Sequence, residues 1–227
     1  MTIQEIYQLA VKMGMDADPR GKDRMKSVLL KRKEAYKTMS SKKKKYFDLE
    51  SLENPYTDTR VLFGDTKKQV KKLMAGIDAD STEVLLVDRL NQKGEKIDLL
   101  IGHHPTGHAL ASLHEVMDIQ IDTFAQHGVP ENVAHALLEE TMGMIKRRIG
   151  PRNNSQTMDV ARLLGVPLVA LHTVWDNLGD AFMRKFLEDK KFDNVGEIVD
   201  AICEIPEFEA VIKDKSGPNI VSGSEKS

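Results

Sequence analysis

The stretch IDLLIGHHP, residues 97–105, decides the fold of this chain. Its first five residues form a near-continuous apolar run, which is typical of a strand buried on both faces in a parallel sheet. Two histidines follow where the run ends, and open α/β sheets bind ligands at the carboxyl ends of their strands. Gly102 and Pro105 flank the pair and can break the side-chain alternation of a strand. The stretch therefore predicts a buried strand that delivers His103 and His104 to a site.

Apolar strands and helices alternate on both sides of this stretch. A short strand is expected at 72–77, and Asp80 with Glu83 resembles the capping box that begins a helix. VPLVAL at 166–171 predicts another buried strand. Further helices are expected at about 109–126, 130–148, 156–164, 178–190 and 194–203. This alternation predicts an α/β fold with a mostly parallel sheet flanked by helices.

Two additions to this α/β core are expected from the local patterns. Residues 1–50 carry apolar side chains at helical spacing, and Pro55 lies in a turn-rich segment, SLENPYTDTR, that reads as a loop. We therefore expect an N-terminal helical extension at 1–60 and an α/β metal-binding domain at 61–227, with a helical insertion at about 108–150.

A second group of metal-ligand side chains follows the strand at 166–171. His172 and Asp176 are four residues apart, so one helical turn would align them on one face. Imidazole and carboxylate ligands without a thiolate suit Zn, Mn, Fe, Ni or Mg-like ions. The metal ligands predicted from the sequence are His103, His104 and Asp176, and the expected proton-transfer residues are His172 and His108. The other interpretation of the histidine pair is a hydrogen-bonded structural pair at a strand end.

Composition limits the classes of protein to which the chain can belong. The single cysteine, Cys203, excludes an intrachain disulfide and a Cys-rich zinc module. No apolar run approaches the length of a membrane span, and the first twenty residues lack the features of a secretory signal, so a cytoplasmic location and no membrane partner are expected.

The charges are divided unevenly along the chain. Residues 1–72 hold 18 Lys and Arg against 10 Asp and Glu, and the rest holds 15 against 25. A basic segment can attract nucleic acid or a phosphorylated ligand. Few aromatic residues are interleaved for base stacking, so a solvated helix face is the favoured interpretation and nucleic acid an unlikely partner.

Four segments together resemble the Nif-three-like family, also called GTP cyclohydrolase I type 2 homologues. The segments are GD at 64–65, KLMAGID at 72–78, DLLIGHHP at 98–105 and LHTVWDN at 171–177. The resemblance covers roughly residues 60–180. It implies that His103 and His104 fall on paired histidine ligands of a dinuclear metal site, that Asp176 falls on its bridging aspartate, and that His172 falls on the histidine four residues before that aspartate.

Two departures from the family pattern bear on function. The segment between His104 and Asp176 is longer than the family pattern, and the later His-x-x-x-Glu ligand pair is missing because no histidine follows His172. The resemblance implies a metal-dependent, GTP cyclohydrolase-like hydrolase of a nucleotide or phosphorylated small molecule, in a homo-oligomer. The alternative, favoured by the missing pair, is a non-enzymatic metal-binding regulatory or interaction module that forms a homo-oligomer.

Overall fold

The structure is a computed structural model that describes residues 1–212 and 214–227. They form two compact units, Met1–Phe182 and Met183–Ser227. The domain boundary expected near residue 60 lies inside the first of these units. In the described part of the chain, no helix combines the length and the apolarity needed to cross a membrane.

The first unit is built on one four-stranded sheet of order β1-β4-β3-β2. β2 pairs with β3 and β3 with β4 in parallel, whereas β1 runs antiparallel to β4. The expected mostly parallel sheet flanked by helices is therefore confirmed. The strands are β1 (Thr59–Phe63), β2 (Leu73–Gly76), β3 (Leu99–Gly102) and β4 (Leu168–Leu171).

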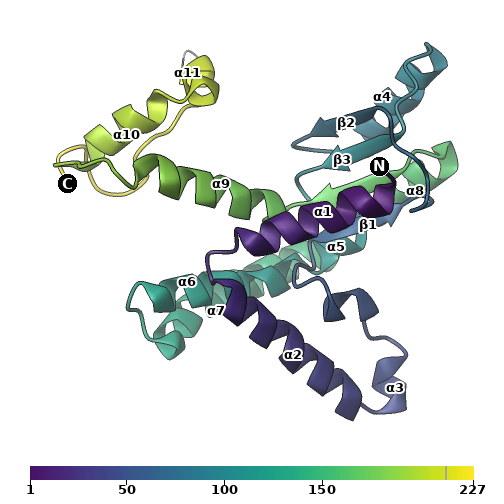
Figure 1. The fold of residues 1–227 in the computed structure, drawn as a ribbon, viewed down its shortest axis with the longest axis horizontal. Helices are drawn as coiled ribbons and strands as arrows, with labels where there is room; N and C mark the ends of the chain where they lie inside the picture. Colours follow the sequence, from purple (N-terminus) through teal and green to yellow (C-terminus); the bar gives the residue numbers. More distant parts are fainter. Residues whose placement is uncertain (213) are drawn as a thin grey trace. The chain divides into compact units, whose positions relative to one another are not determined.

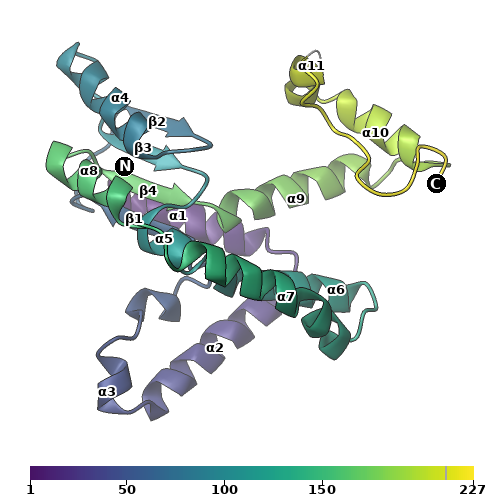
Figure 2. The ribbon, with the colours of Figure 1, turned by 180° about the vertical axis from the view of Figure 1, so that it is seen from behind.

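Helices cover both faces of this sheet because the side chains of β3 and β4 alternate between two apolar cores. Leu100 packs with α4 (Ser81–Gln92) and α8 (Gln156–Leu164), which Figure 2 shows on one side of the strands. Leu99 and Ile101 pack instead against α1 (Ile3–Asp16), which lies across the other face in Figure 1. Burial on both faces explains why these strands read as continuous apolar runs.

The N-terminal helices differ in how many of their side chains are buried. α1 begins at a capping box between Thr2 and Glu5 and places Ile3 in the sheet core, so the first helix belongs to the core. In α2 (Lys22–Thr38), by contrast, Met25 is the one buried residue. The short helices α3 (Ser41–Lys44) and η1 (Leu49–Leu52) follow before β1. The lysines of α2 and α3 thus lie on a largely solvated surface.

Between β3 and α8 the chain forms helices with a small core of their own. Ile121, Ala134 and Leu138 make up that core, where α6 and α7 lie side by side (Figure 2). The segment agrees in position with the expected helical insertion. Its helices are α5 (Gly107–Ala111), η2 (Leu113–Met117), α6 (Asp118–Gln126) and α7 (Glu131–Ile149).

After β4 the chain enters α9 (Thr173–Leu187), whose first part belongs to the first unit. α9 begins five residues before the helix expected at 178–190, directly behind His172. The second unit contains α10 (Val195–Cys203), capped by the Asn194 side chain, and α11 (Pro206–Ile212).

A buried carboxylate joins α1, α9 and the segment before β1. The Asp18 side chain is fully buried and accepts two hydrogen bonds from the Arg20 guanidinium, at 2.9 and 2.8 Å. Tyr56 donates its hydroxyl to Asp18 at 2.8 Å, and Asn177 of α9 donates to the Tyr56 hydroxyl at 3.1 Å. Burial raises the pKa of Asp18, but the donors from Arg20 and Tyr56 outweigh it and the pKa is lowered.

Replacing this carboxylate is expected to destabilise the fold. Asp18→Asn leaves the Arg20 guanidinium buried without its main partner, which costs about 3 kcal/mol in the free energy of unfolding. Chemical denaturation at neutral pH measures the loss, and Asp16→Asn, at an exposed carboxylate two residues earlier, serves as the control with little change.

The same substitution has a defined pH dependence. Because the pKa of Asp18 is lower in the folded chain, its contribution is present above the ordinary Asp pKa of about 3.9 and is lost as the pH falls through the folded value. The difference between wild type and Asp18→Asn should therefore narrow below about pH 4. A constant difference across that range would contradict the assignment.

Gly14 permits a close approach of α1 to α9. A Cβ atom at Gly14 would lie 2.7 Å from the Val174 Cβ and 2.8 Å from its Cα, so the two helices would have to separate. Gly14→Ala is expected to lower the free energy of unfolding by about 2 kcal/mol through overpacking. In Gly179→Ala the added Cβ meets nothing within 4 Å, and the better helix propensity of Ala should raise stability by up to about 1 kcal/mol. Thermal unfolding of both variants checks the opposite signs.

Candidate metal centre

His103 and His104 are held at the end of β3 by the neighbouring strand. The backbone N–H of His103 donates to the Gly76 carbonyl at 2.9 Å, and that of His104 donates to the Ile77 carbonyl at 2.7 Å. Gly102 precedes them because a Cβ there would lie 2.6 Å from the Ala79 Cβ. The parallel pairing of β2 with β3 thus continues through both histidines and fixes their backbone.

His172 reaches the same edge of the sheet from β4. It stands between the last residue of β4 and the first residue of α9, and its carbonyl accepts from the Asp176 N–H at 3.2 Å. The helical turn brings a carboxylate oxygen of Asp176 to 3.4 Å from the His172 Nδ1. The spacing of four residues therefore aligns the two side chains as the sequence predicted.

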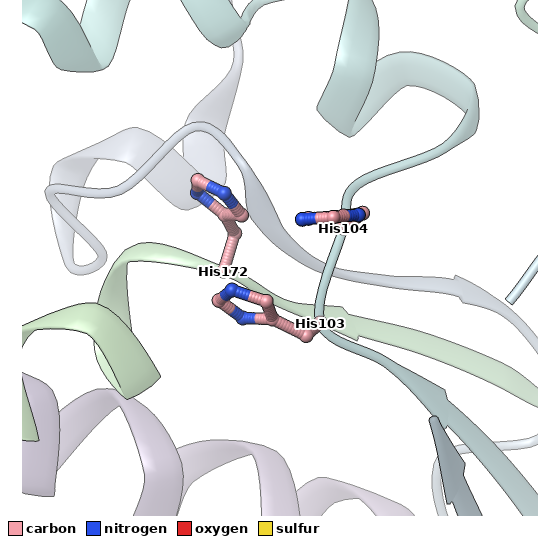
Figure 3. Close-up of side chains that lie close together, drawn as sticks. All are labelled: His103, His104 and His172. Carbon is pink, nitrogen blue, oxygen red and sulfur yellow. The ribbon is translucent and has the colours of Figure 1, made fainter. Parts of the chain in front are cut away.

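Three imidazoles converge where these two strands end. His103, His104 and His172 each offer a ring nitrogen, and the three atoms lie within 4.8 Å of one another. Figure 3 shows His103 and His104 extending from one strand end and His172 from the neighbouring one, with their rings turned toward a common space. The rings of His103 and His172 stack at 4.7 Å between centroids. This group can hold a metal ion.

The Asp176 carboxylate lies beside this group. One of its oxygens is 3.4 Å from the His103 Nε2. Ligand atoms around a tetrahedral zinc, each about 2.0–2.1 Å from the ion, are about 3.3 Å apart. The 3.4 Å separation between Asp176 and His103 matches that value, and the three histidine nitrogens lie within 4.8 Å of one another. The chemistry and spacing of the donor set therefore fit a divalent ion.

Two further carboxylates orient the histidine rings. The His172 Nδ1 lies 2.9 Å from an oxygen of Asp58, and the His104 Nδ1 lies 2.8 Å from an oxygen of Asp78. A carboxylate on Nδ1 favours the tautomer whose Nε2 is free to bind a metal. Asp58 is fully buried and also accepts from the Thr173 hydroxyl at 2.6 Å, whereas the side chain of Asp78 is 74% exposed. Asp58 thus holds its histidine the more rigidly.

Sequence reasoning missed both carboxylates. Asp58 lies in the segment 51–60 that was expected to be a loop, yet β1 begins at Thr59 and brings Asp58 beside the end of β4. Its one signal is that it immediately precedes a Thr-Arg-Val-Leu-Phe run with strand propensity. Asp78 ends the segment KLMAGID, so its place just after an expected strand could have marked it as a residue at the same edge of the sheet.

The electrostatic surroundings of the two partly buried histidines, His103 and His172, differ. Burial lowers the pKa of His103, against an opposing effect of the Asp176 carboxylate, and so favours the neutral ring that binds metal ions. Burial by itself lowers the pKa of His172, but the hydrogen bond and charge of the Asp58 carboxylate have the larger effect, so the pKa of His172 is raised. The His103 Nδ1 is buried and makes no hydrogen bond of good geometry, which leaves one ring nitrogen unsatisfied in the absence of a further partner.

His108 lies in other surroundings. Burial lowers its pKa, and the charged groups that act on it are Arg60, Glu50 and Asp48 rather than the three histidines. It lies on α5 and is not part of the histidine group. Of the residues predicted from the sequence, the structure thus brings together His103, His104, His172 and Asp176, and it leaves His108 apart.

A comparison with solved structures bears on the fold that carries this site. The chain is similar to the crystal structure of a NIF3 superfamily protein from Sphaerobacter thermophilus, with a TM-score of 0.62 and 26% sequence identity. The match covers 75% of this chain and 60% of that one. No protein-family model and no curated protein match the chain. The similarity supports a NIF3-like fold, and the chain spans about 60% of the length of this neighbour.

Loss of the buried carboxylate is expected to weaken metal binding. Asp58→Asn removes the charge that orients His172 and should lower the affinity for Zn about tenfold to a hundredfold. Competition with a chromophoric chelator measures the affinity. Asp78→Asn is the matched variant, and its loss should be smaller because the exposed Asp78 holds His104 less firmly. Equal losses in the two variants would contradict this ranking.

Proposed function

We propose that this chain is a divalent-metal-binding protein that acts as a metal-dependent hydrolase on a nucleotide or a phosphorylated small molecule. The convergence of His103, His104 and His172 at the ends of two parallel strands carries the proposal. In this proposal Asp176 completes the ligand set. The resemblance to the Nif-three-like family supports the substrate class.

The proposal changes the role expected for His172. Its Nδ1 is occupied by Asp58, so its Nε2 is the nitrogen that remains for a ligand. If that Nε2 binds the metal, the ring has no free nitrogen left for proton transfer, and in this proposal we therefore assign His172 to the metal. The surroundings of His108 give no support to the proton-transfer role predicted for it.

The residues around the site prepare it for hydrolysis. A divalent ion held by these residues would supply Lewis-acid chemistry: it would polarise a phosphoryl or carbonyl oxygen and would lower the pKa of a bound water. Asp58 and Asp78 orient two of the ligand rings, and partial burial lowers the pKa of His103, which favours its neutral form. Asp176, whose side chain is 52% exposed, brings its carboxylate ligand to the edge of the site beside His103.

The alternative is a metal-binding regulatory or interaction module without turnover. The observation that favours it is the single histidine group in the described residues, together with the absence of histidine after His172. A lone ion lacks the second metal that clamps the leaving oxygen in dinuclear hydrolases. Assembly into a homo-oligomer belongs to both candidates.

Metal content tests the site that both candidates share. Purified protein loaded with Zn or Mn should carry close to one ion per chain by plasma mass spectrometry, and His103→Ala, His104→Ala or His172→Ala should lower that content. His127→Ala, at an exposed histidine outside the group, is the matched control and should keep the metal. Metal-free protein after loading would refute both candidates.

Turnover separates the two candidates. The loaded protein should hydrolyse a member of a panel of nucleotides and phosphomonoesters, and the three histidine variants should lose that activity. Bound metal without turnover of any compound in the panel would contradict the hydrolase and favour the metal-binding regulatory or interaction module.

A further inference from the structure

An apolar groove opens beside the candidate metal centre. Its volume is about 630 Å³, within the 300–1,000 Å³ usual for small-molecule sites. His103 and Asp176 line it, so the groove is continuous with the proposed ligand set. The rest of its wall is formed by Ile77, Trp175, the small residues Ala75, Gly76 and Gly179, and one further carboxylate, Asp180. A molecule held at the metal therefore has this groove as its nearest apolar surface.

The walls of the groove suit a flat group. Trp175 lies nearly parallel to the His103 imidazole, at 19° and 5.8 Å between ring centroids, and so continues the aromatic surface of the metal centre. Gly179 carries no side chain, and a Cβ there would meet nothing within 4 Å. Ile77 is 65% exposed, which leaves an apolar side chain in water unless a ligand covers it. Aromatic rings gain from contact with such surfaces.

We infer that this groove binds an aromatic ring of the substrate, while the reactive substituent of that ring reaches the metal centre. The inference rests on the proposed function and adds the chemical class of the substrate. A competing occupant is an apolar side chain from a second copy of this chain, which the experiment below distinguishes.

Two probes with the same metal-binding head test the inference. Benzohydroxamic acid carries a phenyl ring and acetohydroxamic acid a methyl group on the same chelating group. Calorimetry on the zinc-loaded protein should show the phenyl compound binding about tenfold more tightly, because the ring buries additional apolar surface. Trp175 is the one tryptophan of the chain, so its fluorescence should change with the phenyl compound and report occupation of the groove directly.

A variant that fills the groove supplies the decisive comparison. Gly179→Leu places a side chain in open space on α9 and should abolish the preference for the phenyl probe while acetohydroxamic acid still binds. Lys185→Leu adds a leucine to the same helix at an exposed position that does not line the groove, and it should keep the preference. Circular dichroism confirms that both variants are folded.

Each other outcome overturns the inference in a recognisable way. Equal affinities of the zinc-loaded wild type for the two probes would contradict a ring-binding subsite in the groove, while metal binding at the centre would stand. A preference that persists in Gly179→Leu would place the ring elsewhere. A change of mass by light scattering in Gly179→Leu, without ring preference in the wild type, would assign the groove to a second copy. Failure to take up zinc would refute the proposed function and the inference with it.

Discussion

The parallel pairing of β3 with β4 is the constraint on which the candidate centre depends. Gly102 lies opposite Ala170 in the register, so His103 and His172 follow within one or two residues of the same level. Parallel strands deliver their carboxyl ends to one edge of a sheet, whereas antiparallel pairing would place these residues at opposite ends. A shift of the register by one residue would turn the side chains of the shifted strand to the opposite core.

Buried polar groups then convert this shared edge into a defined arrangement. Asp58 has no exposed surface and hydrogen-bonds to both His172 and Thr173, which ties the end of β4 to the start of β1. Asp18 connects the end of α1 with α9 in a similar way. It accepts a hydrogen bond from Tyr56, which precedes β1, and the Tyr56 hydroxyl in turn accepts one from Asn177 of α9. A carboxylate without water is stable only when donors surround it, so each of these positions restricts the geometry around it.

Sequence patterns predicted much of this fold and part of the site. The apolar runs of β3 and β4 identified buried parallel strands because both faces are covered, and Asp80 with Glu83 forms the expected capping box. β1 was not predicted because a turn-rich segment precedes it. Its antiparallel pairing with β4 is a contact between segments far apart in the sequence, which no local pattern reveals. α1 was taken for an extension because helical periodicity shows that a face is apolar but does not show what covers it.

The same limit applies to the residues of the centre. The histidines could be recognised by their place after apolar strands, and the spacing of His172 and Asp176 could be recognised as a helical turn. Asp58 could not, since nothing in its neighbourhood marks it as the partner of a histidine far along the chain. The assignment of His108 failed to gain support for a similar reason, because nearness in sequence to His104 did not place it among the same charged groups.

The distance along the chain between Asp58 and His172, 114 residues, also has a consequence for folding. Closing a loop of that length costs entropy before the contact stabilises the fold, so the arrangement around His172 exists only when distant parts of the chain have met. The unfolded chain offers no comparable set of oriented imidazoles. An ion that binds here therefore binds the native state in preference, and by mass action it shifts the folding equilibrium further toward that state as its free concentration rises.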